Sequence, residues 1–145
     1  MKKNTFTSPQ DAETAFYEAL EAGDLDAMME VWAEDEELVC VHPGGPRLVG
    51  YDQVRASWSQ VLGGGQRLKV HISDLVCMQG MMYSVHSLHE NIVVPGQGAA
   101  QPVAAINVYL RTASGWRLIA HHASPVPRSA QRPVEVRETQ PKTLH

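Results

Sequence analysis

Apolar side chains in the first half of the chain recur at helical spacing. After Ser8 and Pro9, the apolar positions of residues 12–20 follow the three- and four-residue spacing of one buried helix face. Serine caps the free amides of a helix start and proline fits its first turn, so this helix begins near Pro9. Similar stripes run over residues 25–32 and 51–62, which predicts two more helices.

The second half of the chain has the pattern of strands separated by turns. A short β-rich segment, residues 38–42, already lies between the second and third helices and ends at a Pro-Gly-Gly turn. Four longer segments then predict an antiparallel meander, because turns or a loop rich in glycine and proline separate them. These four predicted strands cover residues 68–78, 81–90, 103–112 and 116–123.

The order of these elements predicts an α+β fold, with three N-terminal helices on one face of a curved, mainly antiparallel sheet. The last two predicted strands are apolar on both of their faces. Because the helices cover only one face, we expect a second copy of the chain to cover the other face and form a homodimer.

A chain of 145 residues corresponds to one ordinary domain. We place this domain at residues 8–126, after an N-terminal extension of residues 1–7. Residues 127–145 are polar and rich in proline, so we expect them to form a mobile tail or an arm laid on a partner.

Composition and charge exclude several classes of protein. Hydrophobic residues make up 43% and charged residues 19%, which is the balance of a soluble globular domain. The net charge is −4 and no basic stretch carries interleaved aromatic residues, which excludes nucleic acid as a partner. We expect a cytoplasmic protein, because the sequence has neither a membrane-spanning apolar run nor a signal peptide. Cys40 and Cys77 lack metal-binding spacing and are expected to be reduced thiols.

Three stretches of the sequence resemble one protein family. They are YEALEAGDLDAMMEVWAEDEELVCVHPGG, VGYDQVRASW and INVYLRTASGWRLIAHHAS. Together they resemble the SnoaL-like and ketosteroid-isomerase-like branch of the nuclear transport factor 2-like superfamily, over roughly residues 8 to 125. The resemblance implies a cone, in which a strongly bent mixed or antiparallel sheet wraps around three helices and encloses a deep apolar pocket. It also implies a dimer formed through the outer face of the sheet.

The resemblance implies three catalytic residues. Tyr17 matches a tyrosine that donates a hydrogen bond to the substrate oxygen, and its spacing to Asp24 has no gap. His42 matches the general base, which is an aspartate in the ketosteroid isomerases, and Asn107 matches a protonated aspartic acid that donates to the same oxygen. A neutral imidazole accepts a proton near pH 7 and an amide donates without titrating, so both departures keep acid–base chemistry possible.

Each of these residues also has a purely structural interpretation. His42 can be a strand-end histidine whose ring bonds a backbone group beside the turn. Tyr17 can pack at the edge of the apolar helix stripe with its hydroxyl at the rim. Asn107 shares a strand face with Ala105 and Tyr109, and its amide can bond a loop backbone instead of a ligand.

The adjacent histidines His121 and His122 must point to opposite faces of a strand. Unbroken alternation puts His122 on the face of Trp116, and His121 on the face of Arg117. The resemblance implies a histidine of this strand end at the pocket floor. We therefore predict His122 in the pocket and His121 on the outer, dimer-forming face.

Further polar and aromatic residues are candidates for the pocket. His86 and Glu90 share a strand face, either as a dyad in which the glutamate orients the imidazole or as a solvated ladder, and the pattern favours the ladder. A metal site built from His42, His86 and His122 has no supporting motif spacing, so no metal ligand is predicted. Ligand contacts are predicted for Trp32, Trp58, His86, Tyr109, Trp116 and His122.

Two functions from different classes stay open. The first is a cofactor-free enzyme of the isomerase, cyclase or hydratase type, which moves a proton on an apolar molecule bearing a carbonyl or hydroxyl group. The second is a non-catalytic ligand-binding or protein-association domain of the same fold. Either function is compatible with a small apolar molecule in the pocket, and neither calls for a cofactor.

Overall fold

Three helices and six strands make up the fold, which a computed structural model describes for residues 5–65, 67–98, 101–127 and 130. All three predicted helices are present, as α1 (Pro9–Ala22), α2 (Leu25–Val31) and α3 (Tyr51–Leu62). The strands are β1 (Val39–Val41), β2 (Arg47–Val49), β3 (Lys69–Gln79), β4 (Tyr83–Val93), β5 (Gln101–Thr112) and β6 (Gly115–Pro125).

Capping residues determine where α1 and α2 begin. Ser8 Oγ accepts a hydrogen bond from the backbone N–H of Asp11 at 3.0 Å, as the sequence predicts. Asp24 caps α2 in the same way, through the backbone N–H of Ala27 at 3.0 Å. Gly23 ends α1 with a φ of 68°, a left-handed conformation that glycine adopts without strain.

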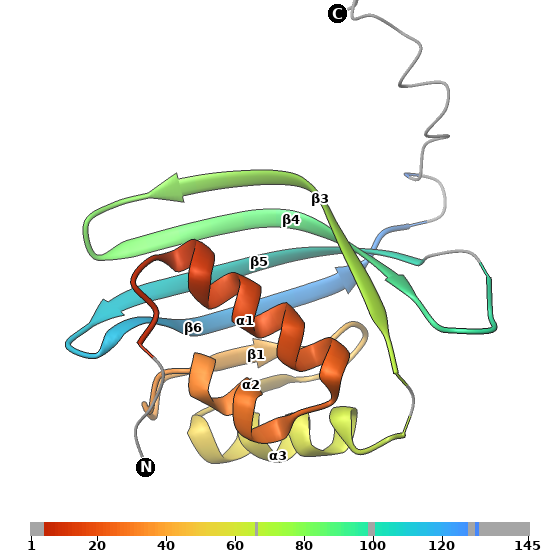
Figure 1. Cartoon of the computed structure of the whole chain (residues 1–145), viewed down its shortest axis with the longest axis horizontal. Coiled ribbons are helices and arrows are strands. Elements are labelled where there is room, and N and C mark those ends of the chain that lie inside the picture. Colours follow the sequence, from red (N-terminus) through yellow and green to blue (C-terminus); the bar gives the residue numbers. More distant parts are fainter. Residues whose placement is uncertain (1–4, 66, 99–100, 128–129, 131–145) are drawn as a thin grey trace, which may run out of the picture.

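One mixed sheet contains all the described strands, in the order β2-β1-β6-β5-β4-β3. Strands β3 to β6 form the predicted antiparallel meander. The short β1 pairs parallel to β6 and antiparallel to β2, a strand that the sequence analysis did not predict. The sheet is strongly curved but does not close into a barrel, because β2 and β3 remain its two edges (Figure 1).

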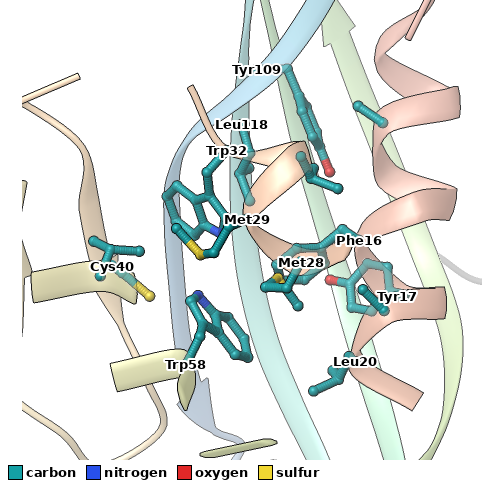
Figure 2. Close-up of a cluster of buried hydrophobic side chains, with 14 of the residues drawn as sticks. Phe16, Tyr17, Leu20, Met28, Met29, Trp32, Cys40, Trp58, Tyr109 and Leu118 are labelled. Carbon is teal, nitrogen blue, oxygen red and sulfur yellow. The ribbon is translucent and has the colours of Figure 1, made fainter. Parts of the chain in front are cut away.

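The helices cover the concave face of this sheet. Figure 1 shows α1 crossing in front of β4, β5 and β6, with α2 and α3 beside β1. Apolar residues of the helices and of the inward strand faces form one core. In Figure 2 the rings of Trp32 and Trp58 lie between Cys40 on one side and Phe16 and Met28 on the other. The predicted α+β cone is therefore confirmed.

A β-bulge interrupts the pairing of β5 with β6. Val108 pairs with Ala120, but the next residue, Tyr109, pairs with Leu118. Ile119 is therefore left without a partner on β5, which is the extra residue of a bulge. An extra residue shifts the in-and-out alternation of every side chain that follows it in the strand.

The bulge reverses the predicted orientation of the two histidines. Leu118 faces the core before the bulge, and His121 faces the core after it, with an exposed fraction of 3%. His122 is exposed on the opposite face. The prediction that His122 lines the interior and His121 the outer face was therefore wrong, because it assumed unbroken alternation along β6.

The N-terminal segment packs onto β6 before the predicted start of the domain. Phe6 is buried, and its carbonyl oxygen accepts a hydrogen bond from the backbone N–H of Trp116 at 2.8 Å. A Cβ atom at Gly115 would lie 2.7 Å from the same oxygen, so this close approach requires glycine. The Arg117 guanidinium lies 5.1 Å from the centroid of the Phe6 ring. The packed fold therefore includes Phe6.

The predicted tail, residues 127–145, lies outside the described residues except for Pro127 and Ala130. Its interpretation as a mobile tail or an arm stays a prediction. None of the described helices is both long enough and apolar enough to cross a membrane.

Candidate functional site

Polar side chains form a row across the concave face of the sheet. The strand register pairs Cys77 of β3 with His86 of β4, His86 with Asn107 of β5, and Asn107 with His121 of β6. His121 in turn lies opposite Cys40 of β1. The interior of the cone is therefore polar along this row, where the resemblance implies an apolar pocket.

Helix α1 adds two polar side chains to the same space. Glu13 and Tyr17 are one helical turn apart and face the sheet, with exposed fractions of 8% and 7%. They join five polar residues of the strands in a buried hydrogen-bonded network, which we name the interior cluster. Its members are Glu13, Tyr17, His86, Glu90, Asn107, Tyr109 and His121.

Glu13 is the acceptor at one end of the interior cluster. Its Oε2 atom accepts hydrogen bonds from Tyr109 Oη at 3.1 Å, from Asn107 Nδ2 at 3.3 Å and from His86 Nδ1 at 3.0 Å. Figure 2 shows the phenol of Tyr109 extending from its strand toward α1. The opposite ring nitrogen of His86 lies 3.0 Å from Ser84 Oγ. The Glu13 carboxylate thus fixes His86 with its proton on Nδ1.

Tyr17 joins Glu90 to Asn107. Its hydroxyl donates to Glu90 Oε2 at 2.6 Å and accepts from Asn107 Nδ2 at 3.0 Å. Burial, together with the negative charge of Glu90, raises the pKa of Tyr17 far above 10, so the phenol stays neutral. Burial also raises the pKa of Glu90 to about 6, against the lowering effect of the Tyr17 hydrogen bond.

His121 completes the network on the side of β6. Its Nδ1 atom lies 2.6 Å from Asn107 Oδ1, and this carbonyl oxygen can only accept, so the Nδ1 atom carries the proton. Burial, together with the neighbouring His42 and His122, lowers the pKa of His121 to about 3, so the ring is neutral. Its Nε2 atom is therefore an unprotonated acceptor, and the centroid of its ring lies 5.0 Å from that of Phe16 and 6.1 Å from that of Trp58.

His42 lies at the end of β1, beside α3. Its Nε2 atom is 3.0 Å from Ser57 Oγ, and that hydroxyl donates its own proton to the carbonyl of Val54 at 2.8 Å. His42 must therefore donate from Nε2, which leaves Nδ1 as an acceptor. Burial lowers the pKa of His42, so the imidazole is neutral at pH 7.

The structure brings two of the three predicted catalytic residues into direct contact. Tyr17 and Asn107 share a hydrogen bond of 3.0 Å. His42 bonds neither of them, and its ring instead packs edge-on against Trp58, with centroids 4.6 Å apart. The Trp58 ring also contacts Phe16, and its centroid lies 6.1 Å from the centroid of the His121 ring. His42 is therefore linked to the interior cluster through its ring contact with Trp58 and not by a hydrogen bond to Tyr17 or Asn107.

The other predicted ligand contacts divide into three groups. Trp58, His86 and Tyr109 lie in or against the interior cluster. Trp32 and Trp116 are buried in the core, and no described hydrogen bond or ring contact joins them to the cluster. His122 is exposed and lies outside it.

The preference for a solvated ladder at His86 and Glu90 was wrong, because both are buried, with exposed fractions of 0% and 3%. They do not form the alternative dyad either, since His86 bonds Glu13 and Glu90 bonds Tyr17.

Glu13 was not identified from the sequence. Its signal is an acidic residue on the apolar face of α1, four positions before Tyr17 and next to buried Ala12. An acidic residue almost never occupies a buried helix position unless a partner satisfies it, so this position indicated an interior polar partner.

The described residues contain no group of three or more histidine, cysteine, aspartate or glutamate side chains arranged to hold a metal ion. The interior cluster offers groups for hydrogen bonding and proton transfer. It combines two carboxyl groups, two phenols, an amide and two imidazoles.

Solved structures define the class of protein to which this fold belongs. A protein from Caulobacter vibrioides with a cystatin-like fold aligns over 83% of this chain and 89% of its own, with a TM-score of 0.67 at 16% identity, which shows the fold alone. A proposed dehydratase of the nuclear transport factor 2-like family, from Streptomyces avermitilis, is 32% identical over 79% of this chain and 91% of its own, with a TM-score of 0.72. The fold is therefore a nuclear transport factor 2-like, or cystatin-like, cone.

The family model of the SnoaL-like domain matches residues 10–129, so the chain belongs to the SnoaL-like domain family. A proposed calcium/calmodulin-dependent protein kinase type II association domain from Thiobacillus denitrificans is 36% identical, over 86% of this chain and 99% of its own, with a TM-score of 0.78. No protein with a curated function matches the chain significantly.

Proposed function

We propose that this SnoaL-like protein binds a small, largely apolar molecule bearing a carbonyl or hydroxyl oxygen, and transfers a proton on it without a cofactor. The observation that carries this proposal is the buried contact between Tyr17 and Asn107, at 3.0 Å, where the resemblance implies the substrate oxygen. Buried polar networks with displaced pKa values are concentrated at functional sites. The related proposed dehydratase from Streptomyces avermitilis is consistent with acid–base chemistry on this fold.

The residues take distinct roles in this proposal. Tyr17 and Asn107 hold the substrate oxygen and stabilise negative charge on it. His42 accepts the proton, because its ring is neutral at pH 7 and its Nδ1 atom is left as an acceptor. Trp58, between His42 and the cluster, supplies apolar contact to the ligand.

Exchange of the α-protons of acetophenone for deuterium tests this proposal, since it needs no knowledge of the natural substrate. We expect the protein to catalyse this exchange, followed by proton NMR in D₂O. His42→Ala should remove most of the activity, because positioned acid–base catalysis contributes about a hundred- to ten-thousand-fold. Tyr17→Phe should lower it by about a hundred- to a thousand-fold with the fold intact.

The pH profile and a control complete this test. The exchange rate should fall with acidification below pH 6.5, since burial lowers the pKa of His42 and a protonated ring cannot accept a proton. His122→Ala, at an exposed position, should leave the rate unchanged. Full activity in His42→Ala would contradict its role, and the neutral His121 would then be the next candidate base.

A second candidate function is a non-catalytic association domain. One observation favours it: among the described residues, the buried side-chain N and O atoms without a hydrogen-bond partner are both indole nitrogens, of Trp32 and Trp58, and neither belongs to the interior cluster. The related association domain from Thiobacillus denitrificans is consistent with this alternative. An assembly much larger than a dimer in sedimentation equilibrium, together with no exchange activity, would favour it over the enzyme.

A further inference from the structure

The hydrogen-bond donors that should hold a substrate oxygen are already in use. Asn107 has two amide protons, and they go to Glu13 Oε2 at 3.3 Å and to the Tyr17 hydroxyl at 3.0 Å. Tyr17 has one proton, and it goes to Glu90 Oε2 at 2.6 Å. A ligand oxygen therefore gains a donor from Tyr17 or Asn107 only if Glu13, Glu90 or the Tyr17 hydroxyl gives up one of these hydrogen bonds.

Of the two carboxylates, Glu90 is the one placed to release its donor. Glu13 Oε2 accepts three hydrogen bonds, whereas the bond from Tyr17 is the only one described for the carboxyl group of Glu90. Glu90 is 3% exposed, and the interior cluster contains no lysine or arginine to balance its charge. A buried carboxylate with a single hydrogen bond and no cation is poorly stabilised in its ionised form.

We propose that Glu90 is a positioning residue that takes up a proton when the ligand binds, and so turns the Tyr17 hydroxyl toward the ligand oxygen. The inference rests on the proposed function. Protonated Glu90 donates to the Tyr17 oxygen, which already accepts from Asn107 and has two lone pairs. The Tyr17 proton is then free to hydrogen-bond the ligand oxygen. The one covalent bond that forms is the O–H bond of the Glu90 carboxyl, and its proton is taken up from the buffer acid in the bulk solvent, which becomes its conjugate base.

The surroundings of Glu90 support this role. On α1 it faces Tyr17 and, farther away, the charge of Glu13, which raises the pKa of Glu90 further. The residues paired with it, Ile72 on β3 and Val103 on β5, carry no charge, and His86 shares its face of β4. With a pKa of about 6, Glu90 gains its proton at modest cost near neutral pH.

This role also bears on the asparagine at position 107. The resemblance implies a protonated acid at position 107, where this chain has an asparagine. Glu90 lies on the adjacent strand β4 and hydrogen-bonds Tyr17, which also bonds Asn107. In the proposed protonated state, Glu90 would supply the carboxylic acid that position 107 lacks.

The test is the pH dependence of acetophenone binding, measured by two-dimensional NMR titration between pH 5 and pH 8. Acetophenone does not titrate in this range, so any dependence belongs to the protein. The dissociation constant should rise about tenfold per pH unit above pH 6, because each binding event takes up about one proton. The matched hydrocarbon α-methylstyrene, which lacks the oxygen, should bind with no such dependence.

Two variants assign the proton to Glu90. Glu90→Gln carries a permanent N–H donor at the same place, so its dissociation constant for acetophenone should be independent of pH. Glu18→Gln, which removes an exposed carboxylate from the same helix as Tyr17, should keep the wild-type slope. Calorimetry of the unmutated protein in two buffers of different ionisation enthalpy should show the same proton uptake, without relying on any variant.

The possible results separate this inference from the proposed function. Binding of acetophenone at the interior cluster with a flat pH profile, or a slope that survives in Glu90→Gln, would overturn the role of Glu90 and leave the proposed ligand site standing. Failure of acetophenone to perturb the cluster at any pH would overturn both.

Discussion

The buried carboxyl group of Glu90 makes the stability of the fold depend on pH. Its carboxyl group is buried, and its pKa is raised from 4.5 to about 6 in the folded protein. A group with a raised pKa stabilises the fold at low pH, and this contribution is lost as the pH rises through the folded-state pKa. The ionised form of Glu90 is therefore a cost to stability above pH 6.

We predict that Glu90→Gln gains stability relative to the unmutated protein as the pH rises from 4 to 8. The gain should be about 2 kcal/mol, because a pKa change of this size corresponds to that free energy. Urea denaturation at the two pH values measures it, with Glu18→Gln as the control that should show almost no change. An equal stability difference at both pH values would mean that Glu90 is not the group that titrates.

Some residues of the interior cluster were predicted from the sequence, and one was not. The resemblance implies that Tyr17 and Asn107 share one substrate oxygen, and the structure joins the two side chains by a hydrogen bond, while their catalytic roles stay predictions. Glu13 was missed. Its hydrogen bonds to His86 and Tyr109 join residues 73 and 96 positions apart, and no local pattern specifies which strand residue a helix residue will meet.

In β6 the side chains do not keep the regular in-and-out alternation that its sequence predicts. The strand itself was predicted, but the bulge at Ile119 was not, since no glycine or proline marks it. One unpaired residue moved His121 inward and His122 outward. The site therefore contains an imidazole bonded to Asn107 that regular alternation assigns to the opposite face.

The helices were easier to predict than the edge of the sheet. Ser8 and the glycine after α1 have strong conformational preferences, so the ends of that helix follow from the sequence. The two short strands β1 and β2 contain three residues each and pair through the turn after His42. Segments of this length lack a periodic signal, and β2 was missed for this reason.

At the scale of the whole molecule, none of the three described helices covers the outer face of the sheet (Figure 1). Val76 and Met78 of β3 and Ile106 of β5 are 55%, 57% and 40% exposed on this face. Exposed apolar side chains that adjoin one another on a sheet indicate an interaction surface. We propose that a second copy of the chain covers this face, as the sequence led us to expect.

We predict a dimer at micromolar concentration in sedimentation equilibrium. Ile106→Glu should shift the protein to monomer, because it places a charge on the proposed interface without touching the core. Val61→Glu is the matched control, since Val61 is 43% exposed on α3, away from the sheet, and this variant should remain dimeric. A monomeric unmutated protein, or a dimer that Ile106→Glu leaves intact, would contradict this interface.

The central claim is that the interior cluster binds a ligand oxygen, and a crystal structure of the protein with acetophenone tests it most directly. The account predicts the ketone oxygen within hydrogen-bonding distance of Tyr17 Oη, with the aromatic ring against Trp58. Acetophenone bound only elsewhere, such as the surface cleft between residues 34–37 and 49–53, with the hydrogen bonds of the cluster unchanged, would contradict it.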